Sequence, residues 1–185
     1  YSYYIHNIRD GDEPLNFENA LEAEAQRKRD GWWLAFYYKE LGCYYSHVKN
    51  YLDNFTNVQV LFYEDMKEDI NKFMETIFSF LDVSQISLNT NQKFNLSGIP
   101  KNQLIHNLIH KNNFSGKVLM KGLSLFLRND QISRIQSKVD KLNLSAKPEM
   151  NESTKIQLKS YFFDDVEKLS QLLNIDLNAK WNIYK

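Results

Sequence analysis

Cysteine, proline and glycine are scarce in this 185-residue sequence, which has one cysteine, three prolines and six glycines. The single cysteine, Cys43, excludes an internal disulfide and favours a reducing compartment, so we expect a cytoplasmic protein. With so few prolines and glycines, we expect one continuous, mostly helical unit. No apolar run approaches the roughly 20 residues that cross a bilayer, so we expect no membrane span.

Neither sign of charge is in excess, because 23 lysines and arginines balance 23 aspartates and glutamates. A protein that binds nucleic acid by diffuse electrostatic attraction is basic, so we expect no nucleic-acid partner. A small anionic ligand held by a few local groups remains compatible with this balance.

The sequence has no G-x-x-x-x-G-K-[ST] loop, no G-x-G-x-x-G loop, no nucleophile elbow and no cysteine-rich metal pattern. We therefore expect no metal.

Hydrophobic spacing predicts several helices. Asn16 is a candidate N-cap for the first of them, in which Phe17, Ala20, Leu21 and Ala25 share one face. Further helical patterns cover residues 41–55, 70–81, 104–109, 117–127, 130–141 and 151–173. Pro100 lies where the first turn of the third of these helices would begin. Residues 147–150 are predicted to form a loop.

Residues 58–63 form a β-rich run that predicts one strand of a buried sheet. A strand that leads directly into a helix is typical of α/β proteins, so we expect an α/β fold whose other strands precede this chain. An all-α fold with one stray strand is the alternative. We interpret Asp65 as the N-cap of the following helix, with Glu68 completing a capping box. A catalytic pair formed by Glu64 and Asp65 is the less favoured interpretation.

Two further groups of residues have a structural and a functional interpretation. His106 and His110 lie four residues apart, but no third ligand is apparent, so we interpret them as a polar pair on a helix surface. The aromatic segment that contains Trp32, Trp33 and Tyr37 suits a hydrophobic core, or a pocket for a sugar or an aromatic acceptor. We retain these three residues as substrate-binding candidates.

Three stretches together resemble the sulfotransferases that use adenosine 3′-phosphate 5′-phosphosulfate (PAPS) as sulfuryl donor. These are SYY (2–4), GCYYSHVKNYL (42–52) and VLFYEDMKEDINKFMETIFSFL (60–81). Cytosolic members have a very similar G-x-x-Y-x-H-V-K and F-Y-E-D-M-K-E-D series. The EPLNFENALEAE and FNLSGIPKN stretches and the C-terminal KPEM and LNAKW region resemble bacterial and heparan-type members.

The resemblance implies a P-loop NTPase-like sulfotransferase fold, which is a parallel sheet flanked by helices. Residues 1–185 would be the mostly helical C-terminal part of a single sulfotransferase domain. The phosphosulfate-binding loop and the usual catalytic base would precede Tyr1, so we nominate no catalytic residue in this chain.

The resemblance also implies roles for individual residues. Ser2 matches a serine that binds the 3′-phosphate of PAPS, and Tyr45 matches a tyrosine that contacts the adenine end. Lys147, in SAKPEM, matches a basic loop that closes over the cofactor phosphates, and Lys101 is a second, weaker match. His6, near Ser2, is a candidate for contact with the acceptor.

The expected reaction is in-line transfer of a sulfuryl group from PAPS to a hydroxyl or amine. The acceptor would be a carbohydrate or another small molecule. Such transfer requires alignment, cations near the moving group and a base for the acceptor proton. A P-loop kinase-like nucleotide-binding domain is the nearest alternative, and a non-catalytic helical module that binds a protein is the other.

Overall fold

The computed structural model describes residues 1–86, 98–110, 118 and 121–181. These residues form two compact units. Unit 1 comprises residues 1–41 and 95–155, and unit 2 comprises residues 42–94 and 156–185. Helices dominate both units, and a two-stranded antiparallel ladder is the one sheet among the described residues. The parallel sheet that the resemblance implies is therefore not present in the part of the chain that the structure describes.

Unit 1 is built around its N-terminal helices, α1 (Ser2–Asp10) and α2 (Phe17–Arg29). As predicted, the Asn16 side chain caps α2 by accepting a hydrogen bond from the Asn19 backbone N–H at 2.9 Å. Phe17, Ala20 and Leu21 are buried, but Ala25 is exposed. The inward face of α2 continues through Glu24 and Arg27 instead, because both side chains have buried polar partners.

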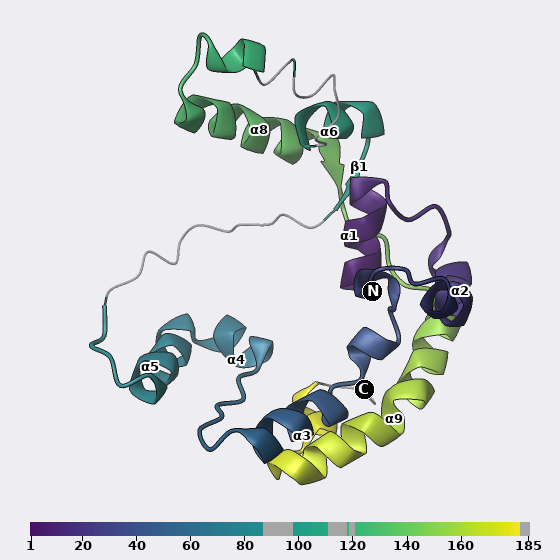
Figure 1. Ribbon diagram of the computed structural model, residues 1–185, viewed down its shortest axis with the longest axis vertical. Helices are drawn as coiled ribbons and strands as arrows, with labels where there is room; N and C mark the ends of the chain where they lie inside the picture. Colours follow the sequence, from purple (N-terminus) through teal and green to yellow (C-terminus); the bar gives the residue numbers. More distant parts are fainter. Residues whose placement is uncertain (87–97, 111–117, 119–120, 182–185) are drawn as a thin grey trace. The chain divides into compact units, whose positions relative to one another are not determined.

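Unit 1 also contains a 3-10 turn η1 (Leu34–Phe36), strand β1 (Ile99–Pro100), helix α6 (Gln103–His110), helix α8 (Asn129–Asn143) and strand β2 (Leu144–Ser145). Strands β1 and β2 pair with Ile99 opposite Ser145 and Pro100 opposite Leu144. In Figure 1, β1 and α6 lie beside α1, in agreement with the contacts between these elements.

The structure places Pro100 in a strand, so its predicted position in the first turn of a helix is wrong. Helix α6 begins three residues later, because the Asn102 side chain caps it by accepting hydrogen bonds from the backbone N–H groups of Leu104 and Ile105. Gly98 precedes the strand and has no room for a side chain. A Cβ atom at Gly98 would lie 2.4 Å from the carbonyl oxygen of Ser145.

Unit 2 contains α3 (Tyr45–Asn54), α4 (Tyr63–Glu68), α5 (Ile70–Phe80) and α10 (Leu177–Lys180). A 3-10 turn, η2 (Glu40–Gly42), precedes α3, and the long helix α9 (Glu152–Leu173) contributes its residues from 156 onward. Asn151 precedes α9 and accepts a hydrogen bond from the Ser153 backbone N–H, so the predicted start of this helix is confirmed.

The predicted strand at residues 58–63 is wrong for this structure. Residues 58–62 are extended but belong to no ladder, and Tyr63 already starts α4. Their exposure alternates as in a strand, with Val58, Val60 and Phe62 half-buried. A strand requires a hydrogen-bonded partner, and the described residues provide none beside this segment.

The predicted N-cap at Asp65 is also wrong, because Asp65 lies inside α4. Asp69 caps the next helix, α5, by accepting hydrogen bonds from the backbone N–H groups of Asn71 and Lys72. Asp65 forms an ion pair with Lys180 instead. Glu68, the expected second half of a capping box, is the last residue of α4.

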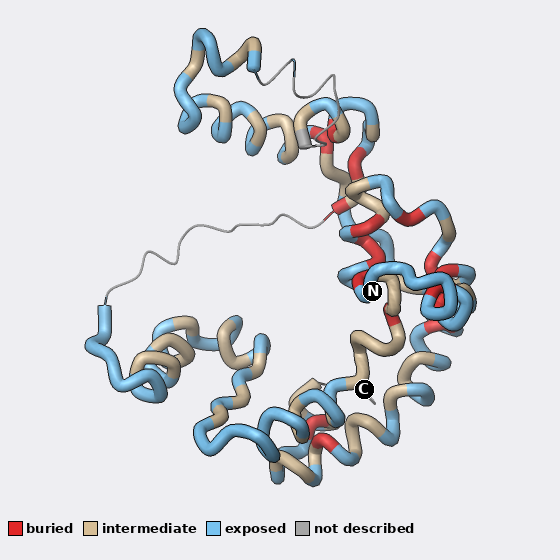
Figure 2. Tube along the Cα trace, viewed as in Figure 1, coloured by how far each residue is buried: buried red, intermediate tan, exposed pale blue. Residues whose placement is uncertain are grey.

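Burial differs between the two units. Tyr4, Ile5, Phe17 and Tyr38 are buried in unit 1, where the three aromatic rings form edge and tilted contacts at centroid distances of 5.0 to 6.3 Å. In Figure 2, the buried positions of unit 1 follow α1, α2 and the ladder, whereas α3 and α5 have none. None of the helices that the structure describes is both long enough and apolar enough to cross a membrane.

Candidate functional site

The start of α1 brings two sequence-predicted residues of unit 1 together. Ser2 is exposed in the first turn of α1. The ammonium group of Lys147 lies over the ring of Tyr1, 4.7 Å from its centroid. The Tyr1 hydroxyl donates a hydrogen bond to the carbonyl oxygen of Pro148 at 3.0 Å, which holds the predicted loop against the helix start. Lys147 therefore contacts the residue that precedes Ser2, although the lysine and serine positions are distant in the sequence.

The side chains at this helix start suit an anion. Ser2 adds a hydroxyl, and Lys147 adds an exposed positive charge. Tyr1 packs edge-on against Phe17 at 4.8 Å and stacks on Tyr4 at 5.8 Å, so the aromatic platform beneath Lys147 is joined to the core.

Lys101 does not extend this group. Its ammonium group donates a hydrogen bond to the carbonyl oxygen of Leu142 at 3.0 Å, at the C-terminal end of α8. Its backbone N–H donates to the carbonyl oxygen of Asn143 at 2.6 Å. A lysine that binds the last carbonyls of a helix has a structural role there. The contacts of Lys101 thus indicate a structural role at the end of α8 and not the binding of a phosphate.

His6 lies on α1, one turn after Ser2, with about half of its side chain exposed. Arg9 Nη2 lies 2.6 Å from His6 Nδ1, and Asp10 Oδ2 lies 3.3 Å from His6 Nε2. Both ring nitrogens therefore have partners on the same helix. This arrangement is suited to an acceptor-facing surface residue and gives no open nitrogen for proton abstraction.

His106 is buried, which corrects its interpretation as a surface residue. Its side chain is 6% exposed, and its Nε2 lies 3.7 Å from Asp10 Oδ1. The side chain of His110 lies outside the described residues. Among the described residues, no group of three or more histidine, cysteine or carboxylate side chains is placed to hold a metal ion.

The aromatic segment 32–38 divides into a buried and an exposed part. Ala35 and Tyr38 are buried, whereas Trp33 is 76% exposed and Trp32 is 39% exposed. The Tyr37 hydroxyl donates a hydrogen bond to the carbonyl oxygen of Trp32 at 2.5 Å. The three substrate-binding candidates thus lie together in unit 1, and the two tryptophans present ring surface to solvent.

A buried polar network fixes this segment, and no short sequence motif predicts it. Arg27 binds Glu13 through two hydrogen bonds, each 2.7 Å long. The Tyr38 hydroxyl donates to Glu13 Oε2 at 2.7 Å, and Asn7 Nδ2 donates to the Tyr38 oxygen and to the carbonyl oxygen of Ala35. The network ties α1 and α2 to η1.

The network also orients the first tryptophan. The Arg27 guanidinium lies 4.8 Å from the ring centroid of Trp32 and 5.6 Å from that of Phe36. A buried charge of this kind is stable only when it is paired and hydrogen-bonded. The sequence does contain a signal for it, because Glu24 and Arg27 follow Phe17 and Ala20 at helical spacing on the inward face of α2.

Proton affinities in the network follow from these contacts. Burial alone would raise the pKa of Glu13, but the hydrogen bonds from Arg27, Tyr38 and the Leu15 backbone lower that pKa below its usual value. Hydrogen bonding to Glu13 raises the pKa of Arg27. Burial raises the pKa of Tyr38 well above its usual value, so its hydroxyl stays protonated.

Tyr45, the candidate for the adenine end of the donor, lies in unit 2 as the first residue of α3. Its backbone N–H, like that of Tyr44, donates to the carboxylate of Asp165 on α9, at distances from 2.8 to 3.3 Å. Asp165 thereby acts as the cap that α3 lacks in its own N-terminal sequence. The Tyr45 ring is half-buried.

Comparison with known proteins identifies the family. A family model described as the sulfotransferase domain matches residues 1–155, so the C-terminal LNAKW region lies beyond this match. A solved sulfotransferase from Alicyclobacillus acidocaldarius is similar in structure, with a TM-score of 0.61 and 22% sequence identity. The match covers 96% of this chain and 50% of that one, so the chain spans half the length of that sulfotransferase.

A search of curated proteins gave no match. The family match covers most of the described chain, and the structural similarity supports the same fold. Both agree with the resemblance that the SYY, GCYYSHVKNYL and YEDMKED stretches indicate. This chain therefore belongs to the sulfotransferase domain family.

Proposed function

We propose that this protein is a PAPS-dependent sulfotransferase that transfers a sulfuryl group to a hydroxyl or amine of a carbohydrate or small-molecule acceptor. The observation that carries the proposal is the contact of Lys147 with Tyr1, the residue that precedes Ser2. The family resemblance assigns Ser2 and Lys147 to phosphate groups of the donor, and the Lys147–Tyr1 contact supports a shared role. Their hydroxyl and ammonium groups are exposed and chemically suited to a phosphate.

The contacts of the other candidate residues support their proposed roles to different degrees. Tyr45 offers a ring and a hydroxyl for the adenine end, and its place at the start of α3 is fixed by Asp165. Trp32, Trp33 and Tyr37 remain candidates for the acceptor, as does His6. Lys101 is the weakest candidate, because its ammonium group already binds the end of α8.

The residues described here bind and orient rather than catalyse. Ser2 and Lys147 would hold the donor phosphate, and the network around Glu13 keeps the Trp32 segment in place. We propose that residues 1–185 are the C-terminal part of the domain and that the catalytic base and the phosphosulfate loop belong to the preceding part. This placement rests on the resemblance.

A transfer assay tests the proposal against the kinase-like alternative. The protein is mixed with a panel of sugars and small alcohols and with either PAPS or ATP as donor. The proposal predicts release of adenosine 3′,5′-bisphosphate from PAPS and no release of ADP from ATP. Release of ADP would favour the kinase-like alternative, and turnover of neither donor by a protein that includes the preceding part would contradict the proposal.

A further inference from the structure

The loop that carries Lys147 is held at both of its ends within unit 1. Residues 146–151 have no regular secondary structure and join β2 to α9. At the β2 end, the Ser145 hydroxyl donates a hydrogen bond to the carbonyl oxygen of Ile99 at 2.8 Å. At the α9 end, the Thr154 hydroxyl donates a hydrogen bond of 2.7 Å to a carboxylate on α2. These two anchors, and not a helix or strand, determine where Lys147 lies.

Thr154 has the surroundings of a side chain that acts through its hydroxyl. It lies in the first turn of α9, is 3% exposed, and has Glu18 Oε1 as its acceptor. A hydrogen bond to a charged acceptor is roughly twice as strong as one between neutral groups. The helix start is already capped by Asn151, which accepts a hydrogen bond from the Ser153 backbone N–H. The Thr154 hydroxyl thus serves to tie the start of α9 to α2.

The first turn of α2 connects this anchor to the ring beneath Lys147. Phe17 precedes Glu18 in that turn, and its ring packs edge-on against Tyr1 at 4.8 Å. Burial, and then the charge of Glu18, raise the pKa of the Tyr1 hydroxyl above its ordinary value. This hydroxyl therefore stays protonated and donates to the carbonyl oxygen of Pro148. One helical turn thus holds both the ring and the loop that meet where Lys147 lies over Tyr1.

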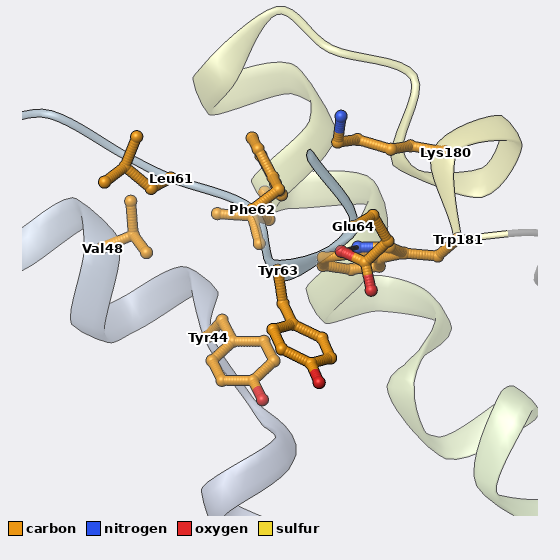
Figure 3. A pocket seen from close by; sticks show the side chains of 9 residues that line it. Tyr44, Val48, Leu61, Phe62, Tyr63, Glu64, Lys180 and Trp181 are labelled. Atoms are coloured by element: carbon orange, nitrogen blue, oxygen red, sulfur yellow. Dashed lines mark hydrogen bonds between the residues drawn. The ribbon is translucent and has the colours of Figure 1, made fainter. Parts of the chain in front are cut away.

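We propose that Thr154, through its hydrogen bond to Glu18, is a positioning residue that places the Lys147 ammonium group for the donor phosphate. This inference rests on the proposed function, which assigns the phosphate contact to Lys147. Without the bond the end of the loop can shift, and a small displacement of a charged group weakens ligand binding. None of these residues lines the aromatic pocket of unit 2 that Figure 3 shows, so the expected effect does not involve that pocket.

Nuclear magnetic resonance tests the positioning without a donor. The ring current of an aromatic side chain displaces the signals of protons above its face upfield. The ε-methylene signal of Lys147, identified by its loss in Lys147→Arg, therefore reports the contact with Tyr1. We expect the upfield displacement to be lost in Thr154→Val, which keeps the shape and removes the hydroxyl, and to be kept in Thr154→Ser. An unchanged Lys147 signal in Thr154→Val would overturn the proposal.

The order of the two variants separates positioning from packing. Thr154→Ser removes a buried methyl group and Thr154→Val does not, so a residue needed only for packing would tolerate valine better than serine. Positioning predicts the reverse. We expect Thr154→Val to weaken binding of adenosine 3′,5′-bisphosphate about fivefold and Thr154→Ser to change it less than about twofold. Weaker binding by the serine variant than by the valine variant would overturn the proposal.

Calorimetric titration of the full protein measures these affinities. Thr76→Val is the matched control, because the Thr76 hydroxyl donates to the carbonyl oxygen of Lys72 on α5 and should not affect the donor. If the wild type binds the bisphosphate and Thr154→Val binds it equally well, the positioning role is overturned and the proposed function stands. If the wild type does not bind it, the proposed function fails, and the Lys147 signal still decides whether Thr154 places the lysine.

Discussion

Lys147 and Lys101 are both exposed lysines, yet their ammonium groups have different surroundings. That of Lys147 lies over Tyr1 beside Ser2, and that of Lys101 binds a carbonyl at the end of α8. We expect Lys147→Ala to weaken binding of adenosine 3′,5′-bisphosphate about tenfold, because it removes a charged donor. Lys101→Ala should change the affinity little. Calorimetric titration of both variants measures the difference, and equal losses would contradict the assignment of Lys147.

The buried pair of Glu13 and Arg27 leads to a prediction about stability. Glu13→Gln removes one charge and leaves Arg27 buried without its partner, so we expect a loss of about 3 to 5 kcal/mol in the free energy of unfolding. The exposed Glu22→Gln is the matched control and should cost less than about 0.5 kcal/mol. Urea unfolding monitored by circular dichroism provides both values.

The same pair makes stability depend on pH. The pKa of Glu13 is lower in the folded protein than its ordinary value of 4.5. Its stabilising contribution is therefore complete above pH 4.5 and is lost as the pH falls through the folded value. The stability difference between the wild type and Glu13→Gln should shrink in acid. A difference that stays constant well below pH 4.5 would contradict the role of the Glu13 carboxylate.

At the level of elements, a cap explains where helix α5 of unit 2 begins. Asp69→Ala removes the side chain that caps α5 and should destabilise the protein by about 1 kcal/mol. Glu68→Ala, one residue earlier and exposed, serves as the control and should change stability by less than about 0.5 kcal/mol. Unfolding midpoints in urea separate the two. A larger effect at Glu68 would favour the capping box at Asp65 that the structure does not have.

Packing of α9 against the start of unit 2 depends on a glycine. A Cβ atom at Gly42 would lie 2.6 Å from the ring of Phe162, so Gly42→Ala should cost about 1 to 3 kcal/mol through overpacking. A Cβ atom at Gly122 meets no atom within 4 Å, and residues 121–124 are helical. Gly122→Ala should therefore be neutral or stabilising by up to about 1 kcal/mol. Thermal unfolding of both variants checks this contrast.

The sequence predicts elements well where local chemistry determines them. Asn16 and Asn151 precede helices as expected, because a capping side chain acts within three residues. The segment at 58–63 was mispredicted because a strand depends on a partner elsewhere in the chain. Pro100 and Asp65 were mispredicted because Asn102 and Asp69 are also capping residues, and hydrophobic spacing alone did not distinguish between them.

At the level of the whole molecule, the site also contains some features that the sequence predicts and others that it does not. The resemblance supplied Ser2 and Lys147, but sequence spacing gave no indication that Lys147 contacts the start of α1. The network of Asn7, Glu13 and Tyr38 was missed because its members come from three segments and no short motif joins them. Family membership, by contrast, was predictable, because it depends on the order of several motifs along the chain.

The central claim is that the protein recognises the 3′-phosphate of a PAPS-like donor. The most direct measurement is a thermal-shift titration with adenosine 3′,5′-bisphosphate, with AMP as the control that lacks the 3′-phosphate. At 100 times its dissociation constant, a ligand stabilises a folded site by about 2.7 kcal/mol. We predict a rise in the unfolding temperature with the bisphosphate and none with AMP. Equal shifts with both nucleotides, or no shift with either, would contradict the claim.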